Sequence, residues 1–387
     1  MILGFGAKNF YSFKEGFEVN LKLSAACPND ISKDKKYTNI LALKGANASG
    51  KTNVLKALTF LSDFATNSFD NKPDSDILFS SYFYNEEPTE LYIIFLVNNI
   101  EYKYEIKLTN KEIVSETIYK KNTIVIQREY NKLIKKSSDF EDLKIIKLRN
   151  NASIISTANQ YDMDSIQELF NLFSNIYTNV SSHGMRDEFA NYTVASKFYY
   201  ENNDVFEFVK NILIKSDTGI KDILIREYED TETKEILYFP VFSYNVNNED
   251  KFLLYREQSS GVKSLFKQLG IYKITLDMGG ILALDEFDIN LHPDLLPMLV
   301  DFFDNVDTNP NDSQLIFTTH NNDIMDDLKK YRVILVNKEE NESFLYRLDE
   351  LSGEILRNDR LITPIYNSGK LGGKPRLTVW VMKIVED

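Results

Sequence analysis

Residues 45–52 run Gly45-Ala46-Asn47-Ala48-Ser49-Gly50-Lys51-Thr52 and match the phosphate-loop pattern G-x-x-x-x-G-K-[ST]. The two glycines let the backbone curl so that consecutive N–H groups face one anion. Lys51 adds a positive charge for the β- and γ-phosphates, and the Thr52 hydroxyl can ligate Mg²⁺. An apolar run precedes the motif and helically spaced apolar residues follow it. The stretch therefore predicts a strand, a phosphate loop and a helix that bind a nucleotide through residues 45–52 and Asn53.

The composition indicates a globular chain with an ordinary core. It has 387 residues, 43% of them hydrophobic, a net charge of −13 and one cysteine, Cys27. The longest apolar run, Leu91 to Val97, is strand-sized, and the N-terminus has no export signal. We expect a cytoplasmic protein without a disulfide in the chain and without membrane contact. The negative charge disfavours an overall basic surface, and the lysine-rich stretch 132–149 is interpreted as a solvated face, which leaves local nucleic-acid contact open.

The hydrophobic pattern predicts a mixed α/β fold. Residues 1–23 and 223–246 suggest hairpins, and the short alternating runs of 91–130 suggest an antiparallel meander. Helical spacing dominates residues 152–215. After residue 258, helices 260–276 and 294–303 alternate with strands, which implies a parallel sheet that the phosphate-loop strand joins across a long insertion.

An acidic pair follows one of these strands. The apolar run 281–284 ends in Asp285 and Glu286. A buried parallel strand delivers its C-terminal residues to the ligand edge of the sheet. Asp285 can hold Mg²⁺ there together with Thr52, and Glu286 can orient and polarise an attacking water.

Two further polar segments accompany predicted elements. His320 follows the strand at 315–318, where its side chain can hydrogen-bond a γ-phosphate. Ser259, Ser260 and Gly261 precede an amphipathic helix; its N-terminal amides can bind an anion, although a plain capped helix is the better explanation of this segment when it is taken alone.

The order of these motifs resembles the ATP-binding-cassette ATPase head, in its RecF-like and chromosome-maintenance branch. Asn9-Phe10-Tyr11-Ser12-Phe13 is similar to that branch's opening N-F-R-S-F, with Tyr11 in place of arginine. The chain also resembles bacterial AAA-family cassette ATPases related to the overcoming-lysogenization-defect proteins, which occur mostly in anti-phage and abortive-infection operons. The resemblance implies a P-loop NTPase head with an antiparallel β subdomain, divided into half-heads 1–150 and 216–364, a helical insert 151–215 and a basic tail 365–387.

The resemblance also implies roles for particular residues. Ser259, Ser260 and Gly261 resemble the signature motif that contacts the γ-phosphate of the other subunit, and His320 resembles the switch histidine. The dimer-contacting loop is matched by Asn290, Leu291 and His292. Val262 stands where the signature has its second glycine, His292 stands where the loop has aspartate, and residues 82–84 offer no glutamine for the glutamine loop, so ATP and GTP both stay open.

These observations favour a Mg²⁺-dependent ATPase that sandwiches ATP in a homodimer. Its expected role is sensor or motor in defence against phage, with a separate nuclease or toxin as effector. The alternatives are a RecF-like repair ATPase that clamps DNA and a non-hydrolysing, nucleotide-gated scaffold. A kinase is disfavoured, because it would not use a signature helix. Overcoming-lysogenization-defect proteins carry a nuclease domain after the head, but only about 50 residues follow Val336 here, the low end of domain size, and we expect no nuclease activity.

Overall fold

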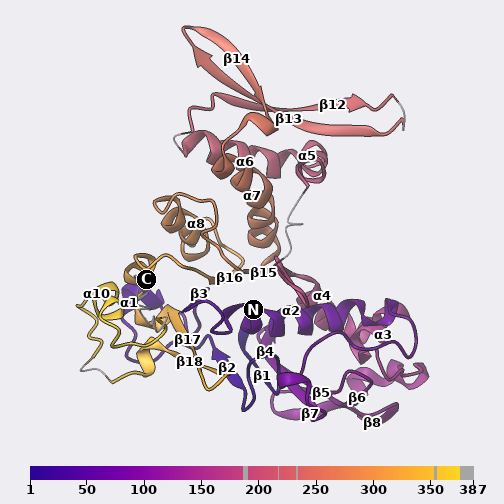
Figure 1. Cartoon of the computed structure of the whole chain (residues 1–387). Helices are drawn as coiled ribbons and strands as arrows, with labels where there is room; N and C mark the ends of the chain where they lie inside the picture. Colours follow the sequence, from indigo (N-terminus) through magenta and orange to yellow (C-terminus); the bar gives the residue numbers. More distant parts are fainter. Residues whose placement is uncertain (186–190, 217, 232–233, 353–354, 375–387) are drawn as a thin grey trace, which may run out of the picture.

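A computed structural model describes residues 1–185, 191–216, 218–231, 234–352 and 355–374. Figure 1 shows a lower part that contains the two large sheets and an upper part in which a small sheet lies over helices. Helix α7 (Ser260–Met278) connects the upper part to the central sheet. None of the helices in the described ranges combines the length and the apolar character that crossing a bilayer requires.

The central sheet has six strands in the order β18-β17-β3-β16-β15-β9. All neighbouring pairs are parallel except β17 with β18. The predicted parallel sheet, and the joining of the phosphate-loop strand to it, are thereby confirmed. The strands are β3 (Ile40–Gly45), β9 (Ile176–Thr178), β15 (Ile281–Leu284), β16 (Gln314–Thr318), β17 (Val333–Glu339) and β18 (Glu342–Arg347).

The second sheet is antiparallel and has seven strands in the order β2-β1-β4-β5-β6-β7-β8. It confirms the predicted hairpin and meander and adds β8 at its edge. Alternate residues of its strands are buried, as expected for a sheet with one covered face. The strands are β1 (Ile2–Lys8), β2 (Phe17–Asn20), β4 (Thr89–Val97), β5 (Ile100–Leu108), β6 (Ile113–Lys120), β7 (Thr123–Glu129) and β8 (Lys132–Lys136).

Helix α2 (Lys51–Asn67) lies between the two sheets. Leu41 and Leu43 of β3 belong to the core that contains α2 and the antiparallel sheet. Ile40 and Ala42 belong to a second core on the other face, with α7 and α8 (Leu295–Asp304). The strand before the phosphate loop is therefore buried on both faces, which explains its unbroken apolar sequence.

Residues 151–215, expected as one helical insert, divide between the two parts of the molecule. Helices α3 (Ile154–Gln160) and α4 (Gln167–Ser174) pack on α2, and β9 then enters the central sheet. Only α5 (Tyr192–Glu201) and α6 (Asn203–Lys215) lie in the upper part. Helical spacing shows that a segment has an apolar face, but it does not show which neighbour covers that face.

The upper sheet contains the predicted hairpin, β12 (Asp222–Glu229) with β13 (Ile236–Val246), and a further strand, β14 (Glu249–Leu254). The shorter elements are α1 (Asn29–Ser32), β10 (Val180–Ser181), β11 (Gly184–Met185), α9 (Ile324–Leu328) and α10 (Ile362–Asn367). Residues 375–387 of the expected basic tail lie outside the described residues.

The lysine-rich stretch 132–149 does not form one uninterrupted basic surface. Lys136 and Lys144 both pair with Glu141. The Arg149 guanidinium lies over the Phe69 ring, 4.1 Å from its centroid. Several of these charges are therefore already engaged within the chain.

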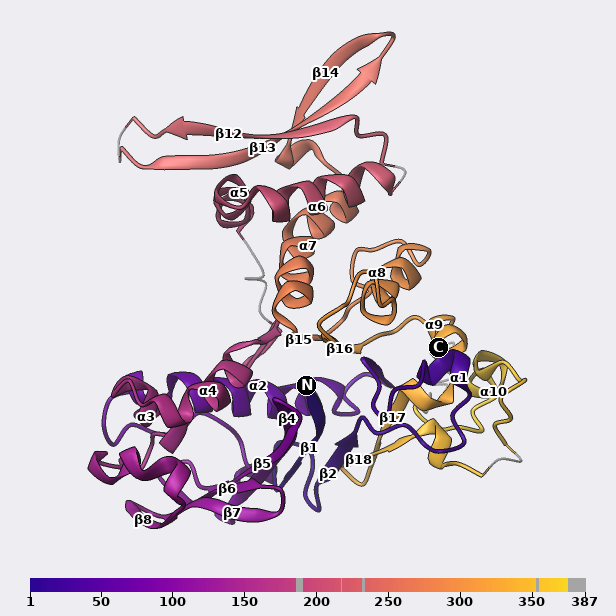
Figure 2. The same cartoon turned by 180° about the vertical axis from the view of Figure 1, so that it is seen from behind.

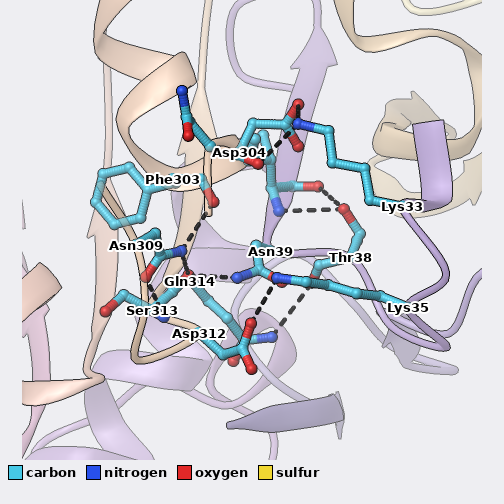
Figure 3. A network of polar contacts seen from close by, with 12 residues as sticks. Lys33, Lys35, Thr38, Asn39, Phe303, Asp304, Asn309, Asp312, Ser313 and Gln314 are labelled. Carbon is cyan, nitrogen blue, oxygen red and sulfur yellow. Dashed lines mark hydrogen bonds and ion pairs between the residues drawn. The ribbon is translucent and has the colours of Figure 1, made fainter. Parts of the chain in front are cut away.

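A polar network joins the N-terminal and C-terminal halves at the amino end of the central sheet (Figure 3). Gln314 is fully buried; its Oε1 accepts from Ile2 N at 2.6 Å and its Nε2 donates to Ile2 O at 2.9 Å. Asn39 Nδ2 donates to Ser313 O at 3.0 Å, beside the start of β3. These bonds satisfy backbone polar groups at the starts of β1 and β16. They therefore fix how the two sheets align at the end opposite the phosphate loop.

A buried ion pair lies within the meander. Arg128 Nη1 lies 3.2 Å from Glu116 Oε2, and both side chains are fully buried. Arg128 also donates to Ala152 O at 2.8 Å, and Glu116 accepts from Tyr104 Oη at 2.8 Å. Burial raises the pKa of Glu116, and the guanidinium opposes that rise. The pair ties β6 and β7 to the segment that leads into α3.

We predict that Arg128→Met lowers the free energy of unfolding by about 3–5 kcal/mol, because it leaves a buried carboxylate without its cation. Urea denaturation measures the loss. Lys103→Met, which removes a half-exposed lysine beside Glu105, is the control and should cost about 0–1 kcal/mol. Equal losses in the two variants would contradict the prediction.

Candidate nucleotide and hydrolysis site

The phosphate loop connects β3 to α2 and is supported from behind by two serines. Ser343 Oγ lies 2.7 Å from both Ser49 O and Ser12 Oγ. Gly50 has φ +111°, and a Cβ atom there would lie 2.7 Å from Ser343 Oγ. A glycine is therefore required at this position by both the backbone conformation and the space.

Lys51 lies inside the curl of the loop. Its Nζ donates to Gly45 O and Ala46 O, each at 3.0 Å, and the side chain is buried. Burial lowers the pKa of Lys51, while Asp285 and Glu286 oppose that change. Ser49 Oγ is buried without a hydrogen-bond partner among the described residues. A positive charge, this hydroxyl and the free amides of the first turn of α2 fit a phosphate group.

Asp285 lies between the phosphate loop and β16. Its Oδ2 accepts from Thr52 Oγ1 at 2.7 Å, and its Oδ1 accepts from Thr318 Oγ1 at 2.6 Å. Among the described residues, no three His, Cys, Asp or Glu side chains cluster as a metal cage. The Thr52 and Asp285 oxygens fit Mg²⁺, which typically takes one or two protein ligands plus phosphate oxygens and water.

Glu286 differs from its neighbour Asp285 in the partners of its carboxylate. Its φ is +50°, and its N–H donates to Thr318 Oγ1 at 2.8 Å. In the part of the chain that the structure describes, no hydrogen bond or ion pair engages its carboxylate. A left-handed conformation is strained for a residue that is not glycine, and such strain is found most often at functional sites.

His320 lies between the acidic strand and the phosphate-loop strand, because β16 is the middle strand of the three. Its backbone N–H donates to both carboxylate oxygens of Asp288 at 3.1 Å. Its carbonyl accepts a hydrogen bond from Lys44 Nζ, and the residue itself is exposed.

Asp288 and Lys44 were not predicted from the sequence. The available signals were an acid two positions after Glu286 and a lysine inside an otherwise apolar strand.

The predicted signature segment and dimer loop approach each other at Gly261 and Asn290, and these two segments are called the second cluster. Ser259 caps α7 by accepting from Val262 N at 3.3 Å, and a Cβ atom on Gly261 would lie 3.3 Å from Asn290 O. His292 is exposed, with Nδ1 3.5 Å from Asp294 Oδ2. Within the described ranges, no hydrogen bond links residues 259–261 to residues 45–53. Figure 2 shows α7 rising from β15 toward the upper sheet.

The sequence matches a protein family over residues 40–326, and the family is described as "AAA domain, putative AbiEii toxin, Type IV TA system". The chain belongs to this AAA-domain family. No protein of curated function matches its sequence.

Two solved structures are similar to this AAA-domain protein. The "SmcHead bound to the C-winged helix domain of ScpA" is 12% identical with a TM-score of 0.53, over 90% of this chain and 99% of that chain. The "SMC head domain from Thermotoga maritima" is 14% identical with a TM-score of 0.44, over 89% of this chain and 98% of that chain. The first likeness shows the P-loop NTPase fold of an ABC-type head; the second is too distant to add to it.

A further polar residue of the AAA domain was missed by sequence reasoning. Asn179 follows β9; its Oδ1 accepts from Asp285 N at 2.7 Å and its Nδ2 donates to Asp285 O at 2.9 Å. The resemblance places the glutamine loop in the region of residues 82–84. That segment is a short 3-10 turn, which lines a cavity of about 250 Å³ with Asn53 and Lys338. Nothing in the short run 176–178 indicated that it joins the acidic strand.

Burial lowers the pKa of Lys44 to about 8 from its usual 10.5, opposed mainly by Asp288. Between these values the unfolded chain binds more protons than the folded one, so stability rises with pH. We predict that the free energy of unfolding of wild type rises relative to Lys44→Met by up to about 1.4 kcal/mol per pH unit above about pH 8.

Urea titrations of both proteins from about pH 7 to about pH 10 test this linkage. Lys8→Met, at an exposed position, is the control for general alkaline effects. A wild-type-to-Lys44→Met difference that stays flat with pH would refute the prediction.

Proposed function

We propose that this chain is a Mg²⁺-dependent ATPase whose hydrolytic site forms at the carboxyl edge of the central sheet. The observation that carries the proposal is the 2.7 Å contact between Thr52 Oγ1 of the phosphate loop and Asp285 Oδ2 of the acidic strand. It joins a phosphate-binding element to a metal-binding carboxylate, and His320 follows the strand between them.

The residues have separable tasks in this mechanism. The loop amides and Lys51 hold the β- and γ-phosphates. Thr52 and Asp285 would hold Mg²⁺, and the bound ion would supply positive charge that neutralises the phosphate oxygens. Glu286 accepts a proton as the water oxygen attacks the γ-phosphorus, and the bond to ADP breaks. His320 donates a hydrogen bond to the γ-phosphate. Glu286 is suited to its task because its carboxylate is otherwise unengaged among the described residues.

The second cluster supports an ATP-sandwiched homodimer. Ser259–Gly261 and Asn290 lie together but form no hydrogen bond with the phosphate loop among the described residues. In a two-fold dimer these segments of one chain would face the nucleotide of its partner. Each site would then be complete only when ATP joins two chains.

The biological role that we propose is defence against phage, with this ATPase as sensor or motor and a separate effector. The family description, which names a putative AbiEii toxin and a type IV toxin–antitoxin system, supports it. A second candidate is a DNA-clamping ATPase, because the head fold is that of SMC proteins. Stimulation of turnover by DNA would favour the second candidate, and absence of turnover under all conditions would favour a nucleotide-gated scaffold.

We predict that Glu286→Gln retains ATP binding but lowers kcat by about 10²–10⁴-fold, because the attacking water loses its base. Lys51→Ala should instead weaken ATP affinity, because it removes the charge held in the loop. Nucleotide affinity and steady-state turnover distinguish the two. Glu101→Gln, an exposed acid on β5, is the control. Near-normal turnover in Glu286→Gln would eliminate the assignment.

We also predict complementation between two inactive variants. Lys51→Ala removes the phosphate-loop charge, and Ser260→Arg blocks the signature surface. Mixed together, they should form heterodimers with one intact composite site and recover part of the turnover. Light scattering of Glu286→Gln with ATP should show dimer mass. A monomer mass under these conditions would rule out the sandwich.

A further inference from the structure

The geometry points to Asp288 and Lys44 as positioning residues that together hold the backbone of His320 in place for hydrolysis. The inference rests on the proposed function, because it concerns the same site. Neither residue is expected to touch the nucleotide; each acts through the histidine.

Asp288 holds the amide side of the histidine. It lies in the loop after β15, and its carboxylate accepts three contacts of 3.1 Å, two from His320 N and one from Asn321 N. Hydrogen bonds to an ionised carboxylate are roughly twice as strong as neutral ones. One side chain therefore fixes two consecutive amides of the loop that follows β16.

Lys44 holds the carbonyl side. It is the residue before Gly45 at the end of β3, it is 3% exposed, and its Nζ donates to His320 O. Asp288 and Asp323 favour its positive charge, Lys51 opposes it, and the Tyr366 ring lies 5.7 Å away. A buried ammonium is costly without partners. The bond to His320 O and the nearby acids offset part of that cost.

The two contacts come from the strands on either side of β16. The loop after β15 supplies Asp288 and strand β3 supplies Lys44. Asp288 therefore holds the amides on both sides of the histidine, and Lys44 holds its carbonyl from the opposite neighbouring strand. With its backbone fixed, the imidazole retains only its two side-chain torsions. A displacement of about 1 Å in a catalytic group can cost about 100-fold in rate, so this restraint has a measurable consequence.

A double-mutant cycle separates positioning from general structural support. Asp288→Asn keeps the shape of the side chain but places an NH₂ group against a backbone N–H. We expect it to lower kcat by about 10- to 100-fold with KM and ATP affinity within about threefold of wild type. His320→Ala should lower kcat by at least as much. In the His320→Ala background, Asp288→Asn should cost less than about twofold more, because the group it positions is gone.

Lys44 is tested by a matched pair of substitutions. Lys44→Met keeps the length and apolar stem but removes the donor, and it should lower kcat with little change in KM. Lys44→Arg keeps a positive charge and N–H donors and should recover part of that loss. Asp301→Asn, an exposed acid on α8, is the control and should leave kcat unchanged. Thermal unfolding of every variant identifies any that fails to fold.

Hydrogen exchange gives a readout that does not depend on turnover. The amides of His320 and Asn321 should exchange about tenfold faster in Asp288→Asn than in wild type, whereas those of Asp301→Asn should not change. Unchanged protection, or additive losses in the double mutant, would overturn the inference. If wild type shows no ATP turnover, the proposed function fails, and the exchange experiment still decides whether Asp288 holds the loop.

Discussion

The site depends on the parallel pairing of the phosphate-loop strand with strands from the far end of the chain. Ile40 pairs with Leu315, and Val333 pairs with Ala42, so β3 lies between β16 and β17. Parallel strands end at one edge, which brings the phosphate loop, the acidic pair and His320 together. The entropy of closing so long a loop is compensated by two cores, one on each face of the sheet.

Buried charged side chains lie at the same edge of the sheet, and hydrogen bonds within the chain satisfy them. Asp285 is satisfied by Thr52 and Thr318, and the buried ammonium groups of Lys44 and Lys51 donate to backbone carbonyls. Preorganised groups of this kind do not have to rearrange when charge develops during phosphoryl transfer. Hydrogen bonds between the loops, more than the loops' own conformational preferences, therefore set the geometry in which a nucleotide would be received.

The carboxyl edge of the central sheet differs from the start of α7 in how closely its residues are connected to the phosphate loop. The phosphate loop, Asp285 and the strand before His320 are linked by direct hydrogen bonds, whereas no hydrogen bond among the described residues links the start of α7 to the phosphate loop. The first group is connected within one chain. The second fits the dimer proposed above, in which it would face the nucleotide of a partner chain, and the small sheet β12–β14 lies above it in the upper part of the molecule.

The sequence by itself determined the phosphate loop with its strand and helix, the acidic strand end, the meander and the parallel sheet, because glycine placement and hydrophobic period are local properties of the chain. Only the tertiary structure decided that residues 151–215 serve two parts of the molecule, that Asn179 contacts Asp285, and that Glu116 and Arg128 pair in the core. It also decided that Asp288 and Lys44 hold His320 from both sides. Periodicity records which face of a segment is apolar, but contacts between loops depend on strand order, and strand order is fixed by pairings between residues hundreds of positions apart.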